Sequence, residues 1–210
     1  MARLINGLLS GRLGNMIYYT KNGKQMVRAR IHSSKTPGPG RLRTWAGFKT
    51  VMDFMKHLTE FVAYAFPVSP DDYAKGRSGF NLAVGANVRS ALLYEGEVPV
   101  IDYARVLVAN GNLKEALGAE VVLEDEGLRF NWLCPTGMDW SYYSDQVMMV
   151  VYFPDQQQAE YVIAGAQRTV CSDLLQLSAA QMSQRMEIYI SFISDDRKAA
   201  ATSTYLGRLH

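Results

Sequence analysis

Two hydrophobic patterns with different periods alternate along the chain, and the first predicts a β-hairpin. Residues 16–20 and 25–31 are rich in apolar, aromatic and β-branched positions, and Lys21-Asn22-Gly23-Lys24 separates them. An Asn-Gly pair accepts the positive φ angles of a two-residue hairpin turn. In the return strand Met26, Arg28 and Arg30 share one face, so we expect a hairpin with one basic face.

The segments on either side of this hairpin have little hydrophobic periodicity. Residues 1–14 contain Gly7, Gly11 and Gly14, without the Gly-Lys-Ser/Thr that completes a phosphate loop. We expect a flexible or extended leader there. Residues 32–40 are rich in Ser, Pro and Gly and predict a linker.

A helical period begins after the linker. Apolar residues recur every three or four positions between Trp45 and Val62, which predicts an amphipathic helix over about 41–65. Ser69-Pro70-Asp71-Asp72 has the cap, the first-turn proline and the acidic residues of a helix start. A further helix is expected over about 78–94. We interpret 41–97 as an antiparallel helical pair.

From residue 98 onward the pattern is that of β-structure. Short alternating or continuous apolar segments are separated by Gly, Pro, Asn and Asp at regular spacing, as in a seven- or eight-stranded sandwich. Trp132 is expected to be a central core aromatic. The predicted strands are 103–109, 118–124, 127–133, 146–153, 159–164, 172–177, 186–194 and 200–207.

Taken together, the patterns predict an α+β protein in three parts. Residues 1–40 form a basic, Gly-rich arm with a hairpin and a linker, and residues 41–97 form the helical pair. Residues 98–210 form an immunoglobulin- or fibronectin-like β-sandwich.

Charged residues are distributed far more unevenly along the chain than its formal net charge of +2 suggests. The first 50 residues contain ten basic residues and no acidic one, which leaves 12 basic and 20 acidic residues in the remaining 160. Such asymmetry is typical of a basic segment that meets a polyanion or the acidic surface of another protein.

Several short motifs resemble an uncharacterised bacterial family of about 210 residues. Its members combine a basic, Gly-rich N-terminus, a helical pair and a C-terminal fibronectin- or immunoglobulin-like β-domain. The resemblance implies this fold and no activity. The matching motifs are Gly11 to Asn15, Phe80-Asn81, Ile101-Asp102-Tyr103, Val150-Val151-Tyr152, Phe192-Ile193-Ser194 and Tyr205-Leu206-Gly207.

The residues that could support catalysis or bind a cofactor are scattered. His32, His57 and His210 fall in a linker, in a helix and at the last position, so none accompanies a nucleophile. Cys134 and Cys171 form no metal-binding pattern, and we expect free thiols. The acidic pairs fall in turns and caps. We therefore expect no enzyme, no small-molecule substrate, no cofactor and no metal site.

Two interpretations of the basic segment remain open. The first is a structural or assembly protein, related by analogy to phage and mobile-element proteins, whose arm docks on a protein partner or on another copy. The second is sequence-tolerant nucleic-acid binding, with aromatic side chains available for stacking. Both would use the cations Arg12, Lys21, Lys24, Arg28, Arg30, Arg41, Arg43 and Lys49 and the aromatics Tyr18, Tyr19 and Trp45.

A third interpretation concerns the β-domain. Trp140, Tyr142 and Tyr143 cluster in a predicted loop, where aromatic rings can stack on a sugar or cover the end of a sandwich. No signal peptide or membrane span is recognisable, so we expect a cytoplasmic protein or a particle assembled in the cytoplasm.

Overall fold

The computed structural model describes residues 3–5, 7–21, 23–30 and 36–210. They divide into two units, Met1–Leu42 and Arg43–His210, and each is described by itself. The predicted boundary between helices and β-domain, at residues 97 and 98, falls inside the second unit. The helical and β parts therefore share one compact body.

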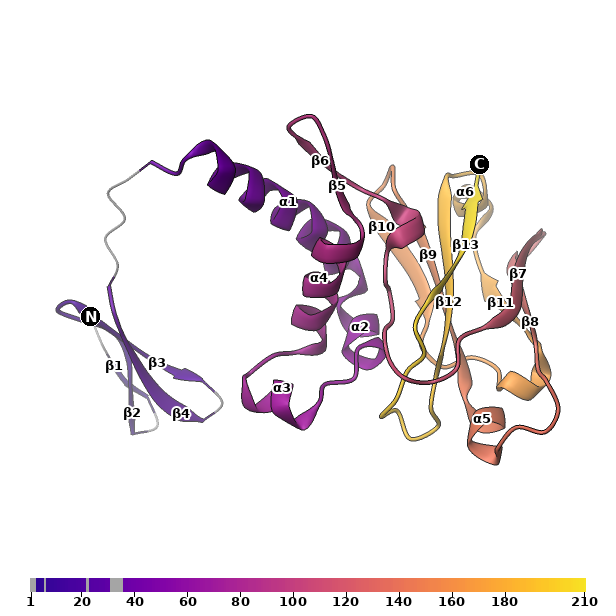
Figure 1. Cartoon of the computed structure of the whole chain (residues 1–210), viewed down its shortest axis with the longest axis horizontal. Coiled ribbons are helices and arrows are strands. Elements are labelled where there is room, and N and C mark those ends of the chain that lie inside the picture. Colours follow the sequence, from indigo (N-terminus) through magenta and orange to yellow (C-terminus); the bar gives the residue numbers. More distant parts are fainter. Residues whose placement is uncertain (1–2, 6, 22, 31–35) are drawn as a thin grey trace. The chain divides into compact units, whose positions relative to one another are not determined.

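The first unit is an antiparallel meander of four strands (Figure 1). Lys21 pairs with Lys24, as the predicted hairpin requires. Of the two expectations for the leader, flexible or extended, the described residues fit the extended one, because they form two further strands. Gly7 and Gly14 have φ of +78° and +58° at the turns that follow β1 and β2, a conformation that favours glycine. The strands are β1 (Arg3–Ile5), β2 (Leu8–Leu13), β3 (Met16–Lys21) and β4 (Lys24–Ala29).

The helix predicted over about 41–65 is interrupted in the structure. Helix α1 (Pro39–Met55) starts earlier than predicted, and the 3-10 turn η1 (Lys56–Leu58) separates it from α2 (Thr59–Ala65). Residues 32–35 of the predicted linker lie outside the described residues, residues 36–38 have no regular secondary structure, and residues 39 and 40 begin α1.

The next helices begin where the sequence predicts and end earlier. The Ser69 side chain accepts a hydrogen bond from the Asp72 amide at the start of α3 (Pro70–Ala74), and Ser78 caps α4 (Gly79–Ser90). Helix α4 stops at Ser90 rather than near 94, because residues beyond it form a hairpin. Its strands are β5 (Leu92–Glu95) and β6 (Val98–Ile101).

The predicted strand 103–109 is wrong. The segment begins with the 3-10 turn η2 (Tyr103–Arg105), and the Asp102 carboxylate accepts the Ala104 amide at its start. Such local capping competes with a strand ladder. The other seven predicted strands are present, with shifted ends. Three short helical elements lie between these strands: α5 (Trp140–Ser144), the turn η3 (Arg168–Val170) and α6 (Ala179–Met182).

These seven strands form two antiparallel sheets. One has the order β11-β8-β7 and the other the order β10-β9-β12-β13. The strands are β7 (Leu117–Glu124), β8 (Gly127–Leu133), β9 (Gln146–Phe153), β10 (Gln158–Val162), β11 (Ser172–Gln176), β12 (Met186–Ile193) and β13 (Thr204–Leu209).

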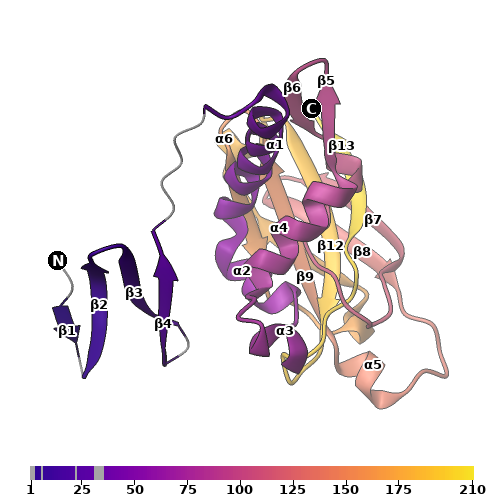
Figure 2. The ribbon, with the colours of Figure 1, turned by 60° about the vertical axis from the view of Figure 1, so that its left-hand side comes forward.

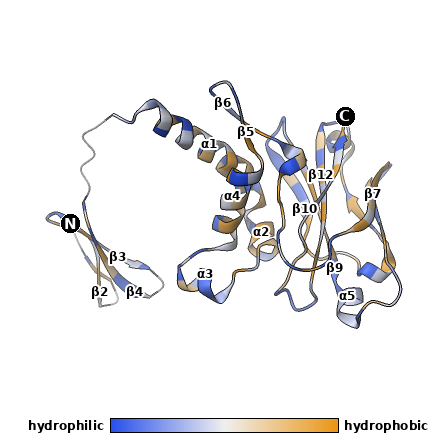
Figure 3. Ribbon diagram, in the orientation of Figure 1, coloured by the Kyte–Doolittle hydropathy of each residue, from blue (hydrophilic) through white to orange (hydrophobic). Residues whose placement is uncertain are grey.

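The four-stranded sheet is covered on both faces. Alternate residues of β9 and β12, such as Met149 and Ile190, pack with Phe130 and Trp132 of β8. The residues between them, such as Val150 and Tyr189, pack against α1, α2 and α4. Figure 2 shows the helices lying over this sheet, and Figure 3 shows hydrophobic residues along α2 and α4. The unit therefore has three layers, which is why all eight residues of β12 are buried.

Trp132 lies in the interior, as predicted. It is 3% exposed, and its ring packs edge-on against Phe192. Its indole Nε1 donates a hydrogen bond to the Arg168 carbonyl at 2.9 Å. Among the described helices, none combines the length and apolar character needed to cross a membrane.

Candidate interaction surface and pocket

The strand register gives the N-terminal sheet two different faces. Arg12 lies opposite Ile17, and Ile17 lies opposite Arg28, so these residues share a face. This basic face carries every charged residue of the four described strands: Arg3, Arg12, Lys21, Lys24 and Arg28. The other, uncharged face carries Leu4, Leu9, Gly11, Leu13, Met16, Tyr18, Thr20, Gln25, Val27 and Ala29.

The uncharged face is largely unburied in the chain as it stands. Leu4 is 71% exposed, Leu13 58%, Met16 49% and Val27 48%. An open four-stranded sheet normally packs one apolar face against another layer. The first unit contains no such layer among its described residues, so nothing within this unit covers the face.

Four of the predicted cations fall together, and four do not. Arg12, Lys21, Lys24 and Arg28 share the basic face. Arg30 follows the end of β4, and its amide donates to the Asn15 carbonyl.

The remaining predicted cations, Arg41, Arg43 and Lys49, lie on helix α1 rather than on the sheet. Arg43 lies over the Tyr94 ring at 4.3 Å, with a carboxylate oxygen of Glu97 3.8 Å from its guanidinium. Lys49 forms an ion pair of 2.6 Å with Asp53. These contacts commit Arg43 and Lys49 to their own unit.

The predicted stacking residues are also separated. Tyr18 lies on the uncharged face and Tyr19 on the basic face, where the Arg28 guanidinium is 5.9 Å from its ring centroid. Trp45 is half exposed on α1. Of the three, only Tyr19 therefore accompanies the cations of the sheet.

Tyr142 and Tyr143, two of the three aromatic residues clustered at the end of the sandwich, contact other parts of the same unit. Tyr142 packs over Arg168, whose guanidinium is also 3.6 Å from the Phe192 ring centroid. The Tyr143 hydroxyl donates to the Pro135 carbonyl. Trp140, at 82% exposure, is the member that presents its ring to solvent.

Arg168 and Asp145 form a buried ion pair beneath this cluster. Their side chains are 1% and 4% exposed, and Nε lies 3.1 Å from Oδ2. The guanidinium also donates to the carbonyls of Lys114 and Glu115. Burial lowers the pKa of Arg168 and raises the pKa of Asp145, because both charged forms lose hydration.

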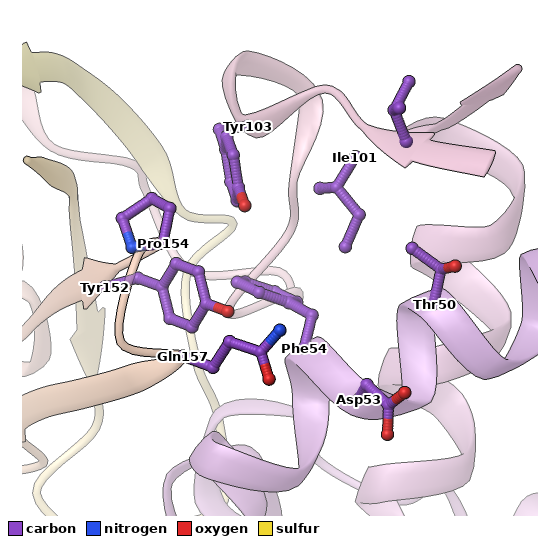
Figure 4. A pocket seen from close by; sticks show the side chains of 9 residues that line it. Thr50, Asp53, Phe54, Ile101, Tyr103, Tyr152, Pro154 and Gln157 are labelled. Atoms are coloured by element: carbon purple, nitrogen blue, oxygen red, sulfur yellow. The ribbon is translucent and has the colours of Figure 1, made fainter. Parts of the chain in front are cut away.

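A pocket of about 400 Å³ lies in the second unit where α1, the β5–β6 hairpin, η2 and the turn after β9 converge (Figure 4). The rings of Phe54, Tyr103 and Tyr152 pack together on one side of it, with centroid distances of 4.6 to 6.1 Å. Asp53 and Gln157 contribute polar groups at its margin.

Three pKa shifts define the protonation states in this pocket, and for Tyr103 burial raises the pKa of the hydroxyl. Burial raises the pKa of Tyr152 well above its ordinary value, so the hydroxyl keeps its proton. The hydrogen bond from Lys49 lowers the pKa of Asp53 more than burial raises it, and the hydrogen bond from Lys56 lowers it further, so the carboxylate is ionised at neutral pH.

The groups that could support catalysis or ligate a metal remain apart. Within the described residues, no three His, Cys, Asp or Glu side chains form a cluster able to hold a metal ion. Cys134 and Cys171 are free thiols. Burial raises the pKa of Cys134, which favours its protonated, less nucleophilic form. His57 has a buried Nε2 without a partner among the described residues.

Comparison with known proteins yields a family. The model of a family of unknown function, DUF6266, matches residues 8–207. The chain belongs to this family. The prediction of an uncharacterised family of about this length is thereby confirmed, and all six motifs quoted for the resemblance lie inside the DUF6266 match. No characterised protein and no solved structure matches the chain at a significant level.

Two features of this DUF6266 chain were not predicted from its sequence. The buried pair joins Asp145 to Arg168 across 23 positions, and the pocket collects residues from Thr50 to Gln157. One signal was present, because Tyr152 lies next to the end of a strand that is apolar on both faces between Gln146 and Tyr152. A hydroxyl at the edge of such a strand needs a partner or water.

Proposed function

We propose that the protein is a non-enzymatic assembly protein whose N-terminal sheet docks through its uncharged face on a second copy. The observation that carries the proposal is the segregation of charge in this sheet. All five charged residues of the described strands lie on one face, and the other face exposes Leu4, Leu13, Met16 and Val27.

A second copy is the occupant that fits this face best. Two uncharged faces can pack against each other without desolvating a charge, and sheets commonly pack face to face in this way. The basic faces then point outward on both sides of a symmetric pair. Docking buries an apolar surface that each copy otherwise leaves in water.

A head-to-tail contact is the competing arrangement for the same function. Residues 1–42 contain eight of the 22 basic residues and no acidic one, which leaves 14 basic and 20 acidic residues in 43–210. The basic face of one copy would then meet the acidic surface of the next. This arrangement leaves the uncharged face exposed, and we therefore favour the symmetric pair.

The second unit is proposed to be a fibronectin- or immunoglobulin-like module with a helical layer added to one face. The support is its connectivity. Strands β7, β8 and β11 share one sheet, and β9, β10, β12 and β13 share the other. Immunoglobulin constant domains likewise place their first, second and fifth strands together and their third, sixth and seventh strands opposite. Their fourth strand joins the first of these sheets, whereas the fourth strand here, β10, lies in the second.

Two adjacent residues of β4 offer a matched test of the assembly. Val27 and Met26 point to the uncharged and basic faces, and they are 48% and 40% exposed. We expect Val27→Glu to abolish the dimer, because a buried, unpaired carboxylate is costly. Met26→Glu should leave the dimer intact. A dimer that survives Val27→Glu, or that Met26→Glu abolishes equally, would refute this interface.

The second candidate function is sequence-tolerant nucleic-acid binding by the basic face. Its support is the set of five cations on one face, with Tyr19 beside Arg28. If all five contact phosphates, affinity should fall by about two to three orders of magnitude between about 50 and 200 mM salt. Titration of labelled DNA and RNA tests this. Met26→Glu should weaken such binding and Val27→Glu should not, which separates the two functions.

A further inference from the structure

The pocket beside α1 combines the size and the composition of a small-molecule site. Its volume of about 400 Å³ falls within the range of about 300 to 1,000 Å³ found for ligand pockets. Helix α1 contributes Phe54 and Asp53, η2 contributes Tyr103, β9 contributes Tyr152 and the turn after it contributes Gln157. Figure 4 shows these side chains converging from separate elements.

Tyr152 carries the polar group that most needs an explanation. The residue as a whole is 4% exposed and lines the pocket, and its hydroxyl has no hydrogen-bond partner among the described residues. Other tyrosines on the same sheet are paired, because Tyr189 donates to the Tyr103 carbonyl and Tyr205 donates to Glu187. Among the described residues, the fully buried polar atoms without a partner do not include this hydroxyl, so it is open to the pocket, where a ligand can accept or donate the missing hydrogen bond.

Charge limits the class of ligand. Asp53 is the one charged residue in the described lining of the pocket, and Lys49 and Lys56 lie 2.6 and 3.4 Å from its carboxylate oxygens. An anionic ligand would meet this carboxylate without a cation in the lining to pair with. A cationic ligand would have to compete with two lysines that already hold it. The site therefore favours a neutral ligand.

The remaining groups define the shape and polarity of that ligand. Phe54 and Tyr152 provide aromatic surface, and Ile101 and Pro154 add apolar contacts. Tyrosine hydroxyls and the Gln157 amide both donate and accept hydrogen bonds. A flat or ring-shaped molecule can contact the aromatic surface, and polar groups around its edge can satisfy these donors and acceptors.

We infer that this pocket binds a neutral ring-shaped ligand with hydrogen-bonding groups around its edge, either a saccharide ring or a nucleoside base. The assignment goes beyond assembly, because all of the lining lies in the second unit and none of it belongs to the N-terminal sheet.

Titration of the full-length protein, followed by protein-observed NMR, tests the assignment. The probes are glucose and uridine as neutral ligands, with glucosamine, glucose 6-phosphate and uridine monophosphate as charged counterparts. We expect one neutral probe to bind with a Kd on the order of 1 mM or tighter and its charged counterparts to bind more weakly. Glucose binding alone identifies a saccharide site, and uridine binding alone identifies a base site.

Tyr152→Phe is the decisive variant, and Tyr161→Phe is its matched control. Tyr161 lies on the neighbouring strand β10, outside the pocket lining. We expect Tyr152→Phe to weaken binding roughly 3- to 10-fold, because one hydrogen bond to the ligand is lost. Tyr161→Phe should leave the affinity unchanged. Because the Tyr152 hydroxyl has no described partner, its removal should leave the Tm unchanged, which separates lost binding from lost folding. The assignment is overturned if neither neutral probe binds, if charged probes bind more tightly, or if Tyr152→Phe binds as the natural protein does.

Discussion

Replacing Arg168 with methionine removes the charge that neutralises Asp145 at the end of the sandwich. The Asp145 residue is 3% exposed, and its carboxylate accepts a hydrogen bond from Arg168 at 3.1 Å. Breaking a buried pair by removing one partner typically costs about 3 to 5 kcal/mol, because the remaining charge stays buried without compensation. The carbonyls of Lys114 and Glu115 lose their donor as well.

Removing both charges should recover most of this loss. Arg168→Met combined with Asp145→Leu leaves two carbonyls without a donor and no buried charge, so we expect a cost of about 1 to 3 kcal/mol. Arg129→Met is the control, because Arg129 and Glu124 form a partly exposed pair expected to contribute less than about 1 kcal/mol. Urea unfolding of the four proteins provides the free energies. A loss below about 1 kcal/mol for Arg168→Met, or a double variant less stable than the single one, would refute this reasoning.

Three further predictions concern the second unit. A Cβ at Gly47 would overlap the Tyr94 hydroxyl, so Gly47→Ala should lower the free energy of unfolding, measured in urea, by about 1 to 3 kcal/mol. A Cβ at Gly85 would have its nearest neighbour at 3.6 Å, so Gly85→Ala should raise the same free energy by up to about 1 kcal/mol. Burial and the hydrogen bond to Glu187 raise the pKa of Tyr205 to about 12, so its contribution to stability should be complete below pH 10 and fall as the pH rises toward 12. Tyr205→Phe should reduce this slope in pH-dependent unfolding. Tyr189→Phe should lower the Tm, because that hydroxyl donates to a backbone carbonyl at 2.8 Å, and an unchanged Tm would contradict the contrast drawn with Tyr152.

Helix caps and turn residues in the sequence predicted those helix starts and strands whose positions depend on neighbouring residues. The Ser69 and Ser78 caps mark helix starts because the side chain itself accepts the free amides. Turn residues separate seven strands that were predicted within a few residues. The sequence Asn6-Gly7 carries the same turn signal as Asn22-Gly23, and weighing it equally would have predicted β1 and β2.

Other features depend on which distant segments meet. Met148, Val150 and Tyr152 were consistent with burial in an ordinary sandwich, yet they face helices rather than a second sheet. The basic and uncharged faces emerge from the register of four strands, which depends on turns that were not all recognised. The pocket residues Thr50 and Gln157 are more than a hundred positions apart, so no local spacing could relate them.

The solution mass of the full-length protein tests the central claim most directly. Sedimentation equilibrium at about 0.1 M and about 1 M salt spans a change in Debye length from about 10 Å to about 3 Å. Because the proposed interface is uncharged, we expect twice the 23.5 kDa of one chain at both salt concentrations. A single-chain mass at both would contradict the assembly. A dimer that dissociates at 1 M salt would contradict the uncharged interface and favour contact between the basic face and the acidic remainder of the next copy.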